Sequence, residues 1–184
     1  MLRLSNRLKL ASPVLGGDSF TGALDAYTTN MDAAWSVSRR LLTSYSGSLI
    51  RVRRSSDNNE QDIGYSAATG LLDTASLLSF VGAGNGFVTK VYAQSGGSGK
   101  DFLQTTAFAQ LRIVNAGSLV TAGTNNRAAA EVVSGSTQFM TTAAFTALTG
   151  TSLTMSAFFR ATSNSLAGRL LGGCQTSQYD SGTG

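Results

Sequence analysis

Charged side chains that could do chemistry are concentrated in one short stretch of this 184-residue chain. Three acidic residues, Asp57, Glu60 and Asp62, closely follow the arginines between positions 51 and 54. A glycosidase uses two carboxyl groups that flank one bond, so a catalytic pair is conceivable here. Carboxylates this near to arginines should stay ionised, which leaves no evident general acid. The simplest interpretation is a set of surface ion pairs, each contributing little to stability.

The remaining residues exclude several other kinds of site. The chain has no histidine and one cysteine, Cys174, so it cannot build a histidine triad, a histidine-ligated zinc site or an internal disulfide. Gly82, Gly84 and Gly86 do not have the spacing of a dinucleotide-binding fingerprint, and the 95–100 loop lacks the first glycine of a phosphate-binding loop. We therefore predict no catalytic residue, no cofactor and no metal ligand.

Composition favours a single β-domain. Apolar residues make up 42% of the chain and charged residues only 13%, and glycine is abundant, which suits short strands joined by tight turns. The net charge of +4 comes from basic residues that are spread along the chain, so we predict no nucleic-acid partner. No apolar run reaches membrane-spanning length, so we predict no membrane insertion, and we expect synthesis in the cytoplasm.

Local patterns predict the elements that would position these residues. Apolar residues at helical spacing predict a helix over residues 31–45, and a second helix over 72–81 is capped by Asp73. Period-two alternation predicts a hairpin over 49–65 and a strand over 87–93. Further short strands are predicted at 111–114, 118–122, 128–133, 137–140, 153–159 and 166–173. The regular spacing favours a sandwich or jelly roll.

We divide the chain into a docking arm (1–22), a β-sandwich domain (23–173) and a tail (174–184). The arm alternates leucines with basic or polar residues, and we predict that it attaches to a neighbouring subunit by adding a strand to its sheet. The residues that we assign to this assembly contact are Leu2, Leu4, Leu8 and Leu10. The tail is either a flexible end or precedes strands that this chain does not contain. Open sheet edges would also favour a homo-oligomer.

The run AAWSVSRRLLTSYSGSLIRVRRSSDNNEQDIG, followed by LLDTASLLSFVGAGNGFVTKVYAQSGGSGK and LRIVNAG, resembles the N-terminal part of the arabinofuranosidase B catalytic domain. More closely, it resembles related concanavalin A-like modules of tailed bacteriophages and prophages. The resemblance implies a mainly β, concanavalin A-like β-sandwich (jelly roll) with one or two short helices, which this chain need not complete. The family usually has YDQSGNG where this chain has YAQSGGSG, and its catalytic acids lie beyond the matched region.

From these observations we predict a non-enzymatic structural component of a phage virion, such as a fibre, decoration or tail-associated protein. It would be located in the virion, with other virion proteins and further copies of itself as partners. One alternative is a carbohydrate-binding module for host-surface glycans, with contacts from Tyr92 and Gln94 or from Tyr179 and Asp180. The other alternative is an arabinofuranosidase-like glycoside hydrolase.

Overall fold

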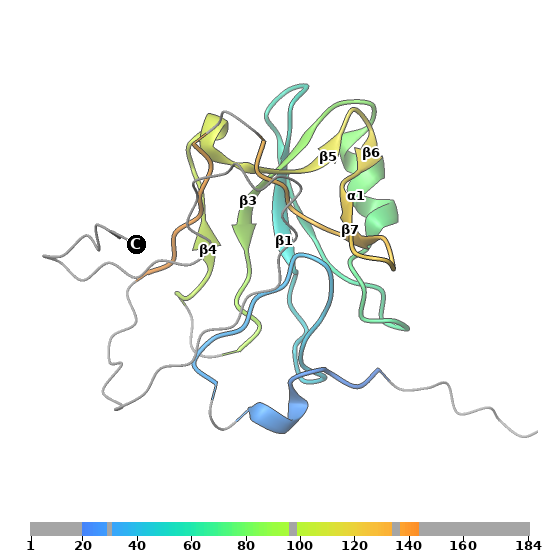
Figure 1. Ribbon diagram of the computed structural model, residues 1–184, viewed down its shortest axis with the longest axis vertical. Coiled ribbons are helices and arrows are strands. Elements are labelled where there is room, and N and C mark those ends of the chain that lie inside the picture. The colour runs from blue at the N-terminus through green and yellow to red at the C-terminus, as the bar shows by residue number, and fades with distance from the viewer. Residues whose placement is uncertain (1–19, 29–30, 96–98, 134–136, 144–184) are drawn as a thin grey trace, which may run out of the picture.

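A computed structural model describes residues 20–28, 31–95, 99–133 and 137–143 (Figure 1). Its centre is an antiparallel sheet in the order β2-β1-β3-β5-β6, and the short strand β4 also pairs with β3. The strands are β1 (Ile50–Arg54), β2 (Glu60–Ile63), β3 (Gly86–Val91), β4 (Phe102–Leu103), β5 (Leu111–Asn115) and β6 (Ser118–Leu119). A separate two-stranded sheet joins β7 (Thr121–Ala122) to β8 (Arg127–Ala128). The helical elements are α1 (Thr74–Val81) and the 3-10 turns η1 (Asp25–Tyr27) and η2 (Ala107–Ala109).

The predicted hairpin forms from β1 and β2, with Ile50 opposite Ile63 and Arg53 opposite Glu60. The other side of β1 pairs with β3, so β1 lies in the interior of the sheet. Strand β3 in turn pairs with β4 at its C-terminal end and with β5 at its N-terminal end. The first strand predicted from the sequence is therefore central to the domain.

One face of the sheet carries the hydrophobic core. Alternation along the strands turns Val52 and Val88 inward, where both are fully buried, and they meet Leu77 and Val81 of α1. Full burial of an aliphatic side chain stabilises the fold by about 1.5–3 kcal/mol. Figure 1 shows α1 packed along one side of the sheet, next to β6.

The predicted cap of α1 is confirmed. The Asp73 carboxylate accepts hydrogen bonds from the backbone N–H of Ser76 at 3.0 Å and from its hydroxyl at 2.7 Å. These bonds satisfy a free donor in the first turn and place negative charge at the positive end of the helix. The helix ends at Gly82, whose φ of +66° suits glycine.

The helix predicted over residues 31–45 is wrong. The described part of this segment is irregular and makes one isolated bridge, between Arg39 and Leu71. Long-range hydrogen bonds hold it: the N–H of Leu72 donates to the carbonyl of Ser38, and the side chain of Gln94 bonds to the backbone on both sides of residue 40. Tertiary contacts therefore override the local helical spacing.

Other strand predictions have mixed outcomes. The segment 137–140 is not a strand, although Thr141 makes a single bridge to Leu103, and the 128–133 strand is reduced to the end of β8 and a bridge at Glu131. Trp35 packs against the core, and the centre of its ring lies 4.5 Å from that of the Phe102 ring. The predicted strands at 153–159 and 166–173 lie outside the described residues.

The architecture is mainly β, a curled antiparallel sheet with one α-helix, as predicted, and it is consistent with a β-sandwich. Among the described residues, no helix has the length and apolar character needed to cross a bilayer. Residues 1–19 of the docking arm, which include Leu2, Leu4, Leu8 and Leu10, lie outside the described residues, and so does the tail.

Candidate functional site

The sheet face opposite the core carries a row of polar side chains, which we call the polar face. Strand register places Arg51 between Lys90 on β3 and Asp62 on β2. Arg51 and Lys90 each lie between two buried neighbours on their strands, and Asp62 precedes the buried Ile63. All three side chains therefore leave the sheet on the side away from the core. Tyr92, just after β3, and Asp101, just before β4, complete the row.

Asp62 is the most strongly held carboxylate of this row. Arg51 donates to its two oxygens from Nε at 2.7 Å and from a terminal nitrogen at 2.9 Å, and the hydroxyl of Tyr92 donates to Oδ1 at 2.8 Å. The bonds from Arg51 lower the pKa of Asp62 below its ordinary value, and the bond from Tyr92 assists, against the opposing effect of burial. Asp62 is therefore ionised at neutral pH, while 39% of its side chain stays exposed.

Tyr92 contacts Asp62 at one end of the row and Lys90 toward the other. Burial, followed by its hydrogen bond to Asp62, raises the pKa of Tyr92 to about 12, so its hydroxyl keeps its proton and remains a donor. The ammonium of Lys90 lies 5.0 Å from the centre of the Tyr92 ring and 3.5 Å from Oδ2 of Asp101. The other oxygen of Asp101 accepts from the backbone N–H of Ala93 at 2.9 Å.

A second row runs beside the first. Arg53 lies opposite Glu60 and Phe87, and its guanidinium stacks 4.9 Å from the centre of the Phe87 ring. It donates to the side chains of Gln110 at 2.8 Å and Asn58 at 2.7 Å. Glu60 is exposed, and its side chain makes no hydrogen bond or ion pair with the described residues. The second row thus contains a carboxyl group that is not engaged in a hydrogen bond or ion pair with the described residues.

The polar face presents two carboxyl groups on one strand, two residues apart. Glu60 and Asp62 point the same way along β2, and two strand residues span about 7 Å. A backbone spacing of this size is compatible with the distances between the two carboxyl groups of glycosidases, about 5–5.5 Å in retaining enzymes and about 6.5–9.5 Å in inverting ones. The described ranges contain no group of three or more acidic or cysteine side chains that could hold a metal ion. Two carboxyl groups on one strand could serve in acid–base or nucleophilic chemistry.

The structure places Tyr92 and Gln94, two of the residues predicted as glycan contacts, in different environments. Tyr92 lies on the polar face, whereas Gln94 is buried, and its amide accepts from the N–H of Leu41 at 2.6 Å and donates to the carbonyl of Arg39 at 3.0 Å. The amide of Gln94 is thus occupied by the backbone. Tyr179 and Asp180 lie outside the described residues. A glycan contact at Tyr92 stays a prediction.

Sequence analysis missed the part of the row formed by Lys90 and Asp101. Lys90 could have been found by counting back one residue from Val91, since alternation then puts it on the opposite side of the strand from that buried residue. Counting from Val88 gives the wrong side, because a register shift interrupts the pairing of β1 with β3. Asp101 gave no such signal, because the turn that returns it to β3 depends on the pairing of β4. The expectation that the acids of the 51–62 stretch stay ionised is confirmed for Asp62 and for Asp57, whose pKa is lowered to about 2 by Arg54.

Residues 24–150 match the family model of the α-L-arabinofuranosidase B catalytic domain. Among solved structures, the chain is similar to a GH54 α-L-arabinofuranosidase soaked with a cyclic sulfate inhibitor. It is also similar to an arabinofuranosidase complexed with arabinofuranosyl-α-1,2-xylobiose. Each match has 33% identity and a TM-score of 0.37, and covers 39% of this chain and 15% of the matched chain. No curated protein sequence matches the chain.

These comparisons correct the function predicted from the sequence. A match to a catalytic domain over residues 24–150 overturns the predictions of a non-enzymatic protein and of a virion fibre, decoration or tail component. None of these matches is described as a phage protein. The sequence-based prediction was wrong because no catalytic acid could be assigned to a residue of the chain. It treated this as evidence against an enzyme. The resemblance to the arabinofuranosidase B catalytic domain is confirmed.

Proposed function

Because the chain belongs to the family of the α-L-arabinofuranosidase B catalytic domain, we propose that it is a glycoside hydrolase acting on α-L-arabinofuranosides. The observation that carries this proposal is the family match over residues 24–150. The matched solved chains are much longer, and the aligned part spans only 15% of each. The substrate class proposed is an arabinofuranosyl side group on a xylo-oligosaccharide, the kind of ligand bound in one of the matched structures.

We propose the polar face as the surface that meets the scissile bond. Hydrolysis of a glycoside needs one carboxyl group to protonate the leaving oxygen and one carboxylate to act as nucleophile or as base for water. Asp62 fits the ionised role, because Arg51 and Tyr92 stabilise its negative charge. Glu60 is the second carboxyl group, two residues away on the same strand and not engaged by any described neighbour.

Arg51 and Tyr92 would act as positioning residues in this arrangement. The bidentate contact from Arg51 fixes the plane of the Asp62 carboxylate, and the protonated hydroxyl of Tyr92 fixes one of its oxygens. A carboxylate held in one orientation reaches the reacting carbon without first being reordered. Tyr92→Phe should therefore lower kcat more than it changes KM.

The proposal is tested by hydrolysis of 4-nitrophenyl α-L-arabinofuranoside with the full chain and three variants. We expect release of 4-nitrophenol by the unmodified protein, and a loss of about 10²–10⁴-fold in kcat/KM for Asp62→Asn and for Glu60→Gln. Asp57→Asn is the matched control, because Asp57 lies in the β1–β2 turn and pairs with Arg54 instead of joining the polar face. That variant should retain full activity.

The outcomes separate the activity from the residues assigned to it. Folded protein that releases no 4-nitrophenol across a range of pH contradicts the proposed activity. Hydrolysis that survives both Asp62→Asn and Glu60→Gln leaves the activity standing but rejects this pair, and places the catalytic carboxyls elsewhere in the chain. A loss shared by Asp57→Asn would mean that the substitutions act through folding.

A further inference from the structure

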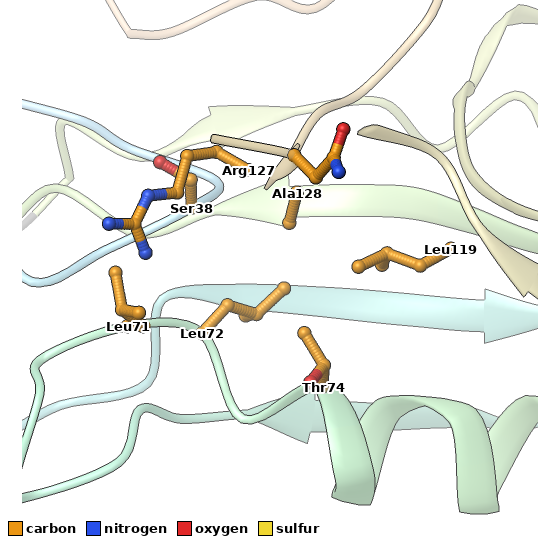
Figure 2. Close-up of a pocket in the computed structure, with 8 residues that line it drawn as sticks. Ser38, Leu71, Leu72, Thr74, Leu119, Arg127 and Ala128 are labelled. Atoms are coloured by element: carbon orange, nitrogen blue, oxygen red, sulfur yellow. The ribbon is translucent and has the colours of Figure 1, made fainter. Parts of the chain in front are cut away.

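A small cavity opens on a different part of the molecule from the polar face (Figure 2). Its volume is about 230 Å³, and none of the polar-face residues lines it. Its lining comes from three regions of the chain. These are Ser38 in the irregular N-terminal segment, the stretch from Leu71 to Thr74 that leads into α1, and the segment from Leu119 at the end of β6 to Arg127 and Ala128 of β8. The cavity therefore lies where three distant segments of the chain meet.

The walls of the cavity are tied together by backbone hydrogen bonds. The N–H of Leu72 donates to the carbonyl of Ser38 at 2.9 Å, and the N–H of Ala129 donates to the carbonyl of Val120 at 3.0 Å. The turn between β7 and β8 is closed by Gly123 and Asn126, which both have positive φ. This turn sets the position of Arg127, the next residue in the chain. Backbone hydrogen bonds thus hold together the segments around the cavity.

Arg127 supplies the positive charge of the cavity lining. Its side chain is exposed and makes no hydrogen bond or ion pair with the described residues, whereas those of Arg51, Arg54 and Arg112 each contact a carboxylate at 2.6–2.7 Å. No carboxylate lines the cavity. Asp73, which lies between two lining residues in the sequence, is directed at Ser76 by its capping hydrogen bonds. The cavity therefore presents one positive charge without a counter-charge from the described chain.

The other side chains have a mixed character. Figure 2 shows Leu72, Leu119 and Ala128 gathered at one part of the cavity, with the guanidinium of Arg127 reaching toward Leu71 and Ser38. The hydroxyls of Ser38 and Thr74 add short polar groups to the lining. An apolar surface beside hydroxyls and a guanidinium suits a ligand with a C–H face, several hydroxyl groups and one carboxylate.

We propose that this cavity binds a uronic acid, a single sugar ring that carries a carboxylate. The guanidinium of Arg127 would hold the carboxylate through two parallel hydrogen bonds, and the leucines would contact the C–H face of the ring. A volume of about 230 Å³ lies below the range of about 300–1,000 Å³ of sites for drug-sized ligands, which favours one ring over a longer chain. The site is separate from the polar face, so the proposal stands whether or not the chain cleaves arabinofuranosides.

The test is an amide NMR titration of the full chain with D-glucuronate, D-glucose and acetate. We expect glucuronate to shift the signals of Ser38, Leu72, Leu119 and Ala128, and to bind at least about tenfold more tightly than glucose, which lacks the carboxylate, or acetate, which lacks the ring. Arg127→Gln should weaken glucuronate binding at least about tenfold, and Arg127→Lys, which keeps the charge but not the planar fork, should fall between.

Arg54→Gln is the control for a general loss of positive charge, because Arg54 pairs with Asp57 and does not line the cavity. It should leave glucuronate binding unchanged. Equal binding of glucuronate and glucose, equal binding of glucuronate and acetate, or unaltered binding by Arg127→Gln would each overturn the proposal. So would the absence of any shift with glucuronate, or shifts confined to the polar face.

Discussion

The two faces of the central sheet are built from the same strands but are held by different forces. On β1, Val52 is fully buried in the core, while its neighbours Arg51 and Arg53 leave the opposite face and bond to Asp62 and Gln110. The apolar face gains its stability from burial of area, which is worth roughly 25 cal/mol per Å². The polar face consists of partly exposed charge pairs, which are worth little individually. The apolar face therefore supplies stability, and the polar face carries the groups that could do chemistry.

The largest expected effect comes from the apolar face. Leu77 of α1 is fully buried against the sheet, so Leu77→Ala removes buried methyl groups and leaves a cavity. We expect a loss of about 2–5 kcal/mol in the free energy of unfolding, measured by urea denaturation. A loss below about 1 kcal/mol would mean that α1 does not close the core, and the proposed difference between the faces would fail.

An intermediate and pH-dependent effect is expected from the polar face. The pKa of Asp62 is lowered in the folded protein, so its contribution to stability is present above the unfolded value of about 3.9 and is lost as pH falls through the folded pKa. Asp62→Asn should therefore be less stable than the unmodified protein at pH 7, and the difference should shrink below about pH 4. Urea midpoints measured from pH 7 to pH 2.5 test this sign, and a difference that grows on acidification would contradict it.

The smallest effect is expected at the surface pair beside the hairpin turn. Arg54 is partly exposed and Asp57 is exposed, so water and salt screen their contact. Arg54→Ala should change the unfolding midpoint less than either variant above, and the change should diminish further in 1 M salt. A salt-insensitive loss would point instead to the stacking of Arg54 on the Phe80 ring, 4.9 Å from its centre.

The parts of the fold that local signals determine could be predicted from the sequence. Period-two alternation located β1 and β3, and the cap at Asp73 located the start of α1. The 31–45 segment could not be placed correctly, because its conformation depends on a hydrogen bond to Ser38 from Leu72 and on the amide of Gln94. These partners lie more than 30 residues away along the chain, where no local pattern reveals them.

The candidate site shows the same limit. The acids and arginines of the hairpin were visible as a group, because β1 and β2 are adjacent in the sequence. The contact of Tyr92 with Asp62 and the contact of Lys90 with Asp101 require β3 and β4 to be in register with β1 and with each other. The cavity beside Arg127 likewise exists only after three separate segments have met. Sequence alone identified the residue types but not these contacts.

The central claim is that a hydrolase of the arabinofuranosidase type works from the polar face. Its most direct test is chromatographic analysis of arabinofuranosyl-α-1,2-xylobiose after incubation with the full chain and with the Asp62→Asn variant. The account predicts arabinose and xylobiose in equal amounts from the unmodified protein, and little of either from the variant. An intact trisaccharide after prolonged incubation with folded, unmodified protein would contradict the account.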